Sequence, residues 1–373
     1  MASKHSNKSS LNKSNENLEK NLEKSSENSS KKTSKLQQWL ENIWYNNGSG
    51  KFLLMPLTAV YCAINRLHRF KHRNNKTKLP CPVIVVGNIT VGGTGKTPLT
   101  IYIVNLLKEA GYKPAIITRG YGGQARSWPQ SVKAQSDPKM VGDEAVLMAS
   151  KTQVPVYTGA DRLESIKALT KQHDCDVIIS DDGMQHYKLP RDIQIAVLDG
   201  ARMLGNGWCL PAGPLRERKK RLSTCEMIVV NGEIASKRKT DLHATDFFTM
   251  HLKGHTLTNL VTDEKKNLED FSKSNGFQAI HAVTGIGNPQ RFFNALKEQG
   301  GLQLITHSFP DHHDFIETDL QFDDDLPVIM TEKDAVKCQR FSNSFAKDSF
   351  WSLPVTAELD NSFKKALLSL LKG

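Results

Sequence analysis

Residues 83–98, with the sequence VIVVGNITVGGTGKTP, constrain this chain more than any other stretch. The β-branched first half predicts a buried strand, and Gly-Lys-Thr follows where a helix is expected to begin. Glycines let backbone N–H groups approach a phosphate, and a helix N-terminus adds partial positive charge. The stretch therefore predicts a loop that holds a nucleoside triphosphate. The alternative is a structural turn whose glycines only allow tight packing of strand and helix.

The side chains of this loop have expected roles. Lys96 would contact the β- and γ-phosphates, and the hydroxyl of Thr97 would bind Mg²⁺. The general P-loop pattern has glycine where this chain has Thr90, so the match is incomplete. The expected nucleotide-binding residues are Thr90, Val91, Gly92, Gly93, Thr94, Gly95, Lys96 and Thr97.

Strands and helices are expected to alternate after Pro82. The predicted strands are 83–87, 114–118, 154–157, 176–180 and 193–198, and the predicted helices are 96–110, 143–151 and 161–172. This alternation predicts an α/β fold of the P-loop NTPase kind, with a mostly parallel sheet and helices on both faces. The apolar run 227–230 restarts the pattern, so we expect a second, smaller α/β lobe from there to the C-terminus.

The N-terminal part is rich in basic residues. The chain has a net charge of +11, and the segment from Asn42 to Lys108 contains no Asp or Glu. Residues 36–79 combine apolar and aromatic side chains at helical spacing with a basic end, and the apolar run is too short and interrupted to span a bilayer. This pattern predicts an amphipathic helix in a membrane interface. The alternative is an ordinary helix packed on the core.

The cysteines and the N-terminus bear on location. The six cysteines form no C-x-x-C pair and no zinc spacing, which suits a reducing compartment. Residues 1–35 are nearly all Ser, Asn, Lys and Glu, so we expect a disordered tail without a secretory signal. The chain is therefore expected on the cytoplasmic side.

Two carboxylates follow a predicted buried strand. Asp181 and Asp182 come directly after 177–180 and before a glycine. An acidic residue at this place, downstream of a P-loop, is the Walker-B arrangement that puts a carboxylate beside Mg²⁺. The alternative is an Asp-Asp-Gly turn without a ligand.

Each of the other polar residues that stand out has two possible roles. Asp143 opens a predicted helix and could be its N-cap, or it could accept the proton of an attacking hydroxyl. His312, in the run PDHHDF, could assist proton transfer or have no role, and zinc is not expected because adjacent histidines seldom bind one ion. Arg119, Arg162 and Arg216 lie in loops rich in glycine or proline, where each could stabilise a transferring phosphoryl group or form a surface ion pair.

Several longer motifs occur together over residues 38–370. They are VVGNITVGGTGKTP (85–98), RGYGG (119–123), GDE (142–144), DDGMQH (181–186), GNGWCLPAGPLRE (205–217), GIGNPQRFF (285–293), PDHH (310–313) and TEKDAVKC (331–338). In this combination and order the chain resembles the tetraacyldisaccharide 4′-kinase family. That family also lacks the first P-loop glycine, so Thr90 agrees with the family, whereas the tail 1–35 does not match it.

The resemblance implies a reaction and a set of roles. The γ-phosphate of ATP would pass to the 4′-hydroxyl of a tetraacylated glucosamine disaccharide 1-phosphate, giving lipid IVA, with ATP and Mg²⁺ required. Asp143 would be the general base, supported by His312. The remaining implied roles are phosphate contact by Lys96, Arg162 and Arg216, and metal binding by Thr97, Asp181, Asp182 and Glu217.

The resemblance also implies a setting. We expect a monomer bound peripherally to the anionic cytoplasmic face of the bacterial inner membrane, with no nucleic-acid partner. The expected segments are a disordered tail (1–35), an amphipathic membrane-associating segment (36–79), a P-loop kinase domain (80–225) and a C-terminal α/β lobe (226–373).

The main alternative function is a P-loop switch, an ATPase or GTPase that drives assembly of a partner. Nucleic-acid binding through the basic segment is a third, without a recognisable module.

Overall fold

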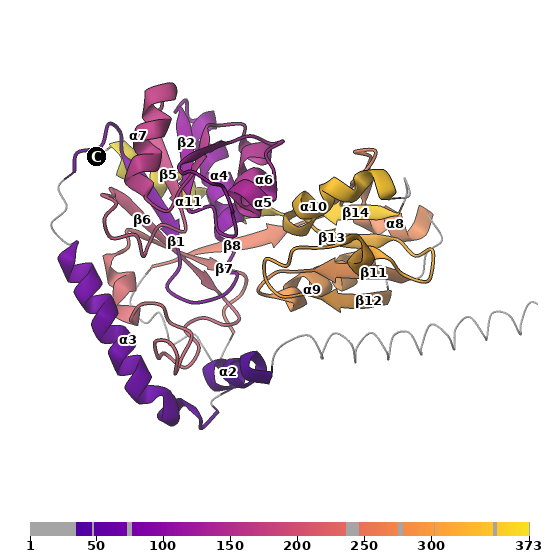
Figure 1. Cartoon of the computed structure of the whole chain (residues 1–373), viewed down its shortest axis with the longest axis horizontal. Helices are drawn as coiled ribbons and strands as arrows, with labels where there is room; N and C mark the ends of the chain where they lie inside the picture. The colour runs from indigo at the N-terminus through magenta and orange to yellow at the C-terminus, as the bar shows by residue number, and fades with distance from the viewer. Residues whose placement is uncertain are drawn as a thin grey trace, which may run out of the picture. The chain divides into compact units, whose positions relative to one another are not determined.

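The computed structural model of the chain describes residues 35–46, 48–72, 77–235, 246–274, 279–301, 303–345 and 349–372. These residues form two compact units (Figure 1). The P-loop unit comprises Leu36–Lys253 and Val355–Gly373, and the inserted unit comprises Gly254–Pro354. The predicted disordered tail lies outside the described residues, except for Lys35.

The P-loop unit is built on a nine-stranded sheet in the order β15-β8-β7-β6-β1-β5-β2-β4-β3. Neighbouring strands from β8 to β4 are parallel, and β15 and β3 pair antiparallel at the two edges. Each strand and helix predicted between 83 and 198 is present with ends shifted by at most two residues. The strands are β1 (Val83–Gly87), β2 (Pro114–Thr118), β3 (Gln130–Val132), β4 (Val156–Thr158), β5 (Val177–Asp181), β6 (Ile193–Asp199), β7 (Met227–Asn231), β8 (Phe248–Lys253) and β15 (Thr356–Leu359).

Helices cover both faces of this sheet, as predicted. Val83 and Val85 of β1 belong to the same buried cluster as Ile166 of α7. Successive side chains of a strand point to opposite faces, so Ile84 and Val86 turn to the other side, where α4 contacts β1, β2 and β5. The helices of the unit are α2 (Lys35–Tyr45), α3 (Lys51–Lys71), α4 (Lys96–Glu109), α5 (Pro138–Val141), α6 (Asp143–Thr152), α7 (Arg162–Gln172), the 3₁₀ helix η1 (Lys219–Thr224) and α11 (Asn361–Lys372).

The structure divides the chain differently from the predicted boundary between 225 and 226. β7 pairs in parallel with β6, with Ile195 opposite Met227, and β8 pairs with β7. The second α/β unit is inserted in the sequence between β8 and β15. The restart of the pattern at Met227 is therefore a further strand of the first sheet. A buried parallel strand has the same apolar pattern whichever sheet it joins, so the sequence could not distinguish the two.

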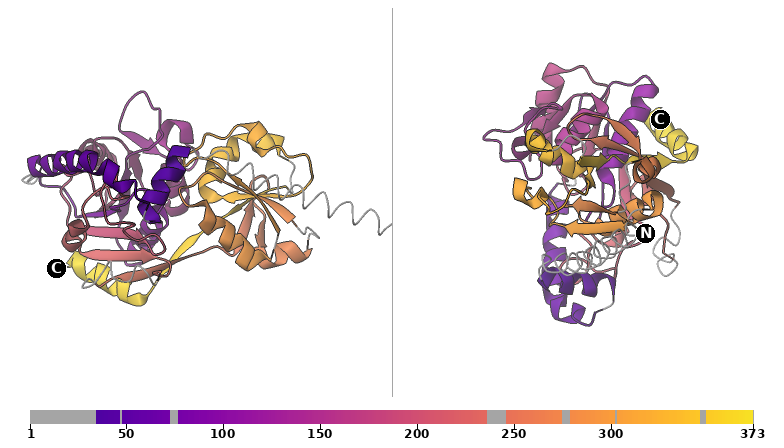
Figure 2. Two further views of the ribbon diagram at one scale, coloured as in Figure 1. Left: turned by 90° about the horizontal axis from the view of Figure 1, so that it is seen from below. Right: turned by 90° about the vertical axis from the view of Figure 1, so that its right-hand side faces the viewer.

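The inserted unit is the smaller α/β lobe that the sequence predicts, with different bounds. Its six-stranded sheet has the order β10-β9-β14-β13-β11-β12. α8 and α9 cover one face of this sheet and α10 covers the other (Figure 2). Phe271 of α8 and Phe292 of α9 belong to one buried cluster, and Ala335 of α10 belongs to a separate one. The elements are β9 (Thr256–Asn259), β10 (Lys265–Asn267), α8 (Leu268–Ser274), β11 (Ala279–Thr284), α9 (Pro289–Gly300), β12 (Gln303–Ser308), η3 (Glu317–Leu320), β13 (Val328–Thr331), α10 (Glu332–Cys338), η4 (Gln339–Ser344) and β14 (Phe350–Leu353).

The N-terminal segment is helical, as predicted. α3 is the long helix that Figure 1 shows at the edge of the P-loop unit. Among the described residues, no helix combines the length and apolar character needed to cross a bilayer.

Candidate active site

The glycine-rich loop joins β1 to α4. Gly95 occupies the N-cap position of α4 with φ 91°, in the left-handed region that favours glycine. The Asn231 side-chain amide, at the end of β7, donates to the Thr94 carbonyl at 3.0 Å. A Cβ on Gly95 would lie 2.4 Å from the Asn231 Nδ2 atom, so both the backbone angle and the available space require glycine. Lys96 and Thr97 consequently stand in the first turn of α4, where backbone N–H groups lack helical partners.

A second loop, residues 205–217, holds the glycine-rich loop in place. The Val91 N–H donates to the Pro214 carbonyl at 2.9 Å, and the Arg216 N–H donates to the Ile89 carbonyl at 2.7 Å. Thr90 forms an antiparallel bridge with Leu215. Thr90 is not among the residues with positive φ, so its backbone does not require the glycine of the general pattern.

Asp181 and Asp182, here called the aspartate pair, lie beside this loop at the end of β5. The Thr100 hydroxyl, on α4, donates to Asp181 Oδ1 at 2.8 Å. Lys96 Nζ lies 3.7 Å from Asp182 Oδ1, and Arg216 Nη1 lies 3.4 Å from Asp182 Oδ2. The structure thus brings together four residues that the sequence singled out: the aspartate pair, Lys96 and Arg216.

The two carboxyls of the pair differ in electrostatics. Burial, followed by the nearby charges of Glu144 and Asp182, raises the pKa of Asp181, whose side chain is fully buried. For Asp182, burial acts in the same direction, but the charges of Lys96 and Arg216 outweigh it and lower the pKa. One member of the pair therefore resists ionisation and the other is held as a carboxylate.

The aspartate pair fits a magnesium ion. Asp181 Oδ2 and Asp182 Oδ1 are buried and form no hydrogen bond with the residues that the structure describes. Mg²⁺ prefers oxygen ligands and is typically held by one or two carboxylates together with substrate phosphates and water. No group of three or more His, Cys, Asp or Glu side chains in the described part of the chain is arranged to hold a metal by itself. The pair and the Thr97 hydroxyl would thus share the ion with the nucleotide.

Glu217 has protein partners on both of its oxygens. Its Oε1 accepts from Gln185 Nε2 at 3.0 Å, and its Oε2 lies 3.3 Å from Arg221 Nε. Gln185 Nε2 also donates to the Asn88 carbonyl at 2.9 Å, next to the glycine-rich loop. Glu217 therefore orients Gln185 against that loop, and each of its oxygens keeps a lone pair that could still face a metal ion.

Asp143 is the first residue of α6 and only 5% exposed. The N-cap position is occupied by Gly142, with φ 94°, so the structure does not give Asp143 the N-cap role that was the alternative. Asp143 Oδ1 accepts from the Glu144 N–H at 2.8 Å. Because the charge of Glu144 contributes to the raised pKa of Asp181, the start of α6 lies within electrostatic reach of the aspartate pair.

Arg162 is buried at the start of α7, with 3% of its surface exposed. Its Nη1 donates to the Gly159 carbonyl at 2.9 Å and lies 3.3 Å from the Ala160 carbonyl, while its Nε forms no hydrogen bond within the described residues. Burial and the charge of Arg119 lower the pKa of Arg162 to about 10, and the aspartate pair acts in the opposite direction. Arg162 therefore supplies buried positive charge near the carboxyl ends of the strands.

His312 belongs to the inserted unit. It has φ 61°, and its Nε2 lies 3.3 Å from Lys333 Nζ and 3.9 Å from Asp311 Oδ1. Lys333 Nζ is also 3.4 Å from Asp311 Oδ1. Within its own unit, His312 thus stands in a small cluster of charged side chains in the loop after β12.

Three residues of the site were not predicted from the sequence: Asn231, Thr100 and Gln185. Asn231 supports the glycine-rich loop, Thr100 orients Asp181, and Gln185 links Glu217 to Asn88. A polar residue directly after the apolar strand 227–230 was a usable signal for Asn231. Thr100 carried no local signal, because a threonine inside a helix is ordinary.

The comparisons with known proteins agree with this geometry. A family model described as tetraacyldisaccharide-1-P 4′-kinase matches residues 50–372. The chain belongs to the tetraacyldisaccharide 4′-kinase family. This result confirms the resemblance seen in the sequence motifs.

Individual members of the family are similar over most of the chain. The tetraacyldisaccharide 4′-kinase of Nitrosococcus oceani is 43% identical over 332 residues, covering 88% of this chain and 93% of the relative. That of Shewanella denitrificans is 44% identical over 340 residues, covering 90% and 98%. A crystal structure of LpxK from Aquifex aeolicus in complex with ATP superposes with a TM-score of 0.69 at 26% identity, covering 86% of this chain and 99% of that one.

Proposed function

We propose that this chain is an ATP- and Mg²⁺-dependent kinase of lipid A biosynthesis. It transfers the γ-phosphate of ATP to the 4′-hydroxyl of a tetraacylated glucosamine disaccharide 1-phosphate and forms lipid IVA. The observation that carries this proposal is the meeting of Lys96, Arg216 and the aspartate pair at the glycine-rich loop, in a chain of the tetraacyldisaccharide 4′-kinase family.

Phosphoryl transfer depends on positioning and on stabilising negative charge. The nucleotide-binding residues 90–97 present backbone N–H groups and Lys96 to the phosphates, and Arg162 and Arg216 add positive charge. When bound, Mg²⁺ neutralises charge on the β- and γ-phosphates. Thr97 and the aspartate pair would hold that ion, and Glu217, whose Oε1 accepts from Gln185, is the fourth residue that we propose for it.

The attacking hydroxyl must lose a proton. As its oxygen bonds to the γ-phosphorus, the bond from phosphorus to the oxygen bridging the β- and γ-phosphates breaks, and ADP leaves. We assign the proton to the Asp143 carboxylate, with His312 in support. A base in this position contributes a factor of roughly 10²–10⁴ to the rate. Support for Asp143 comes from its burial at the start of α6, within reach of the aspartate pair through Glu144.

The acceptor carries acyl chains, and α3 offers a surface for them. Its polar side chains point inward: the Tyr61 hydroxyl and Asn65 Nδ2 donate to the Arg216 carbonyl at 3.1 and 2.9 Å. Its apolar side chains are exposed, with 77% of Leu53 and 69% of Leu67 accessible. An apolar helix face open to solvent marks an interaction surface, and the neighbouring basic residues suit anionic lipid.

We therefore assign the chain to the anionic cytoplasmic face of the bacterial inner membrane as a peripheral protein. The bilayer covers the apolar face of α3 that a second copy would otherwise have to cover, so we propose a monomer. This arrangement brings the Arg216 backbone, which α3 contacts directly, next to the surface where the acceptor resides.

Dependence of ADP formation on the acceptor separates a kinase from a P-loop switch. We expect ADP to form rapidly with ATP, Mg²⁺ and the disaccharide 1-phosphate in neutral-detergent micelles, and at less than about a hundredth of that rate without the acceptor, because the activated group is the acceptor hydroxyl. Equal rates with and without the acceptor would contradict the proposal and favour the switch.

A further inference from the structure

Arg202 lies beside the glycine-rich loop and has no role among the residues assigned above. It belongs to the turn that follows β6, which ends at Asp199. Gly92 of the loop has φ 97°, and a Cβ built on it would lie 3.6 Å from Arg202 Nη1. The next residue, Gly93, is exposed, and a Cβ there would meet no described atom within 4 Å. A guanidinium group thus stands next to the loop where the loop backbone is open to a ligand.

The protein holds Arg202 at both ends of its side chain. The Arg202 N–H donates to Asp199 Oδ1 at 3.0 Å, which fixes the turn. The guanidinium lies over the ring of Tyr45, with Cζ 5.3 Å from the ring centroid. Tyr45 is the last residue of α2, and α2 is docked through Trp44, whose Nε1 donates to the Pro211 carbonyl at 2.9 Å. The position of the guanidinium is therefore set before a nucleotide binds, which lowers the entropic cost of a contact with one.

The strand order places Arg202 and the aspartate pair on different sides of the glycine-rich loop. The loop leaves the end of β1, and β1 pairs in parallel with β5 on one side and with β6 on the other. The aspartate pair stands at the end of β5, whereas Arg202 follows β6. A Mg²⁺ ion at the aspartate pair leaves the triphosphate with a net negative charge. A cation on the β6 side suits that remaining charge.

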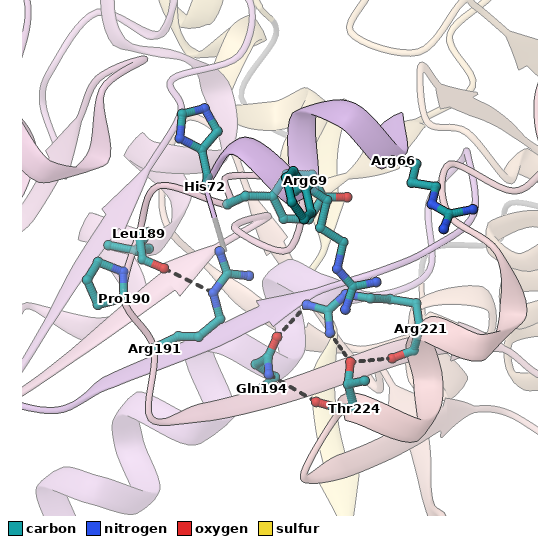
Figure 3. A pocket seen from close by; sticks show the side chains of 11 residues that line it. Arg66, Arg69, His72, Leu189, Pro190, Arg191, Gln194, Arg221 and Thr224 are labelled. Atoms are coloured by element: carbon teal, nitrogen blue, oxygen red, sulfur yellow. Dashed lines mark hydrogen bonds between the residues drawn. The ribbon is translucent and has the colours of Figure 1, made fainter. Parts of the chain in front are cut away.

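Arg202 is separate from another group of arginines in the P-loop unit. Four arginines line an open pocket of about 660 Å³ at the C-terminal end of α3 (Figure 3): Arg66, Arg69, Arg191 and Arg221. Within that group Arg221 Nε lies 3.3 Å from Glu217 Oε2, so a protein carboxylate balances part of its charge. Arg202 is not a lining residue of this pocket. Its neighbours are the glycine-rich loop and α2.

A phosphate oxygen is the ligand that an arginine in this position fits. Guanidinium groups bind phosphates through paired N–H donors, and in P-loop enzymes an arginine at the γ-phosphate stabilises the transferring group. We propose that Arg202 is a further phosphate-binding residue, which contacts the β- and γ-phosphates of ATP at the Gly92–Gly93 turn, with Tyr45 as the positioning residue that holds its guanidinium there. This inference rests on the ATP binding in the proposed function and adds two residues to it.

Calorimetric titration with ATP and Mg²⁺ tests this assignment, using the full chain in neutral-detergent micelles without acceptor. R202M keeps an unbranched side chain but removes the charge, so the Kd for ATP should rise about 10- to 100-fold, as for the loss of charge-assisted hydrogen bonds. R202K keeps the charge and loses the paired donors, so its Kd should lie between those of wild type and R202M.

K113M is the matched control. Lys113 is exposed and directly precedes β2, at the amino ends of the parallel strands and so at the edge of the sheet opposite to the glycine-rich loop. K113M removes the same unit of positive charge, and the Kd for ATP should stay within about twofold of the wild-type value.

Tyr45→Leu tests the positioning role through a double-mutant cycle. Loss of the cation–π contact should raise the Kd for ATP about 2- to 5-fold in the wild-type background. The same substitution should have no further effect in R202M, because the ring would act only through the guanidinium. An equal rise in both backgrounds would contradict the positioning role and show that Tyr45 acts on the fold alone.

The remaining outcomes separate the inference from the proposed function. A Kd for R202M within about threefold of wild type, or equal Kd values for R202K and R202M, would overturn the assignment of Arg202 even if the acceptor is phosphorylated. If the Kd series is as expected and the wild-type chain does not phosphorylate the acceptor, the proposed function fails and Arg202 remains a nucleotide-binding residue.

Discussion

At the scale of single residues, the two members of the aspartate pair differ in their surroundings. Asp181 is fully buried with one oxygen lacking a hydrogen bond, whereas Asp182 is held by Lys96 and Arg216. Burial of an ionisable group is tolerated at functional sites because a ligand or metal later supplies the missing partner. Binding of nucleotide and Mg²⁺ should therefore stabilise the folded chain against unfolding, in addition to supporting the transfer reaction.

The raised pKa of Asp181 has a definite consequence for stability. Above the ordinary Asp value of 3.8, the folded chain binds more protons at this position than the unfolded chain, so the contribution of Asp181 to stability falls as pH rises through its folded-state pKa. Without nucleotide and metal, Asp181→Asn should therefore raise the Tm, and the gain should be larger at pH 8 than at pH 5. Calorimetry at the two pH values measures this, and an identical difference at both would contradict the assignment.

Asp182→Asn is the matched control within the pair. The pKa of Asp182 is lowered, so its carboxylate stabilises the fold above its unfolded pKa, and the substitution should lower the Tm at pH 8. Both variants should lose most transfer activity, because each removes a proposed metal ligand. A Tm shift of the same sign in both variants would show that their electrostatic environments do not differ as described.

At the scale of elements, α3 inverts the usual arrangement of an amphipathic helix. Its Thr58 hydroxyl is buried, accepting from the Ala212 N–H at 3.0 Å, while Leu53, Leu57 and Leu67 are exposed. A helix that places polar groups against its own protein leaves its apolar surface for another environment. The inward polar contacts also explain how α3 stays attached to the 205–217 loop with little apolar burial.

Leu53→Ser with Leu67→Ser tests this face. Both side chains are mostly exposed, so the free energy of unfolding in solution should change by less than about 1 kcal/mol. Binding to anionic vesicles should weaken about 100-fold or more, since each leucine forfeits roughly 1.5–3 kcal/mol of burial in the interface. Vesicle flotation measures binding, with Leu370→Ser, an exposed apolar residue of α11, as control. Unchanged binding of the double variant would contradict the membrane assignment.

The positions of the strands and helices were largely predictable, because the sequence patterns that specify them lie within each segment. The β-branched run before Gly87 and the apolar run before Asp181 each specify a buried strand, and the aspartate pair was expected at the end of the second. Partners from distant segments were not predictable: Asn231 meets Thr94, and Arg66 shares a pocket with Arg221. The position of Asn231 after an apolar strand marks it as a residue of interest, but nothing in a single sequence says which distant residue it or Arg66 lies beside.

At the scale of the whole molecule, the chain is a nine-stranded P-loop unit interrupted in sequence by a second α/β unit. The second unit was expected, but its bounds were not. They depend on the return of the chain to the first sheet at β15, which pairs with β8, and the sequence does not show which strand β15 pairs with. The family match spans residues 50–372 and thus both units. The proposed function accordingly belongs to both units, with α3 included as part of the P-loop unit.

The position of the transferred phosphate tests the central claim most directly. The reaction of ATP with the disaccharide 1-phosphate should give a lipid with a second phosphate, whose ³¹P signal correlates with the proton on C4′ of the non-reducing glucosamine. Its appearance in step with ADP would establish transfer to the 4′-hydroxyl. A phosphate correlated with any other sugar proton, or ADP formed without a new lipid phosphate, would contradict the account.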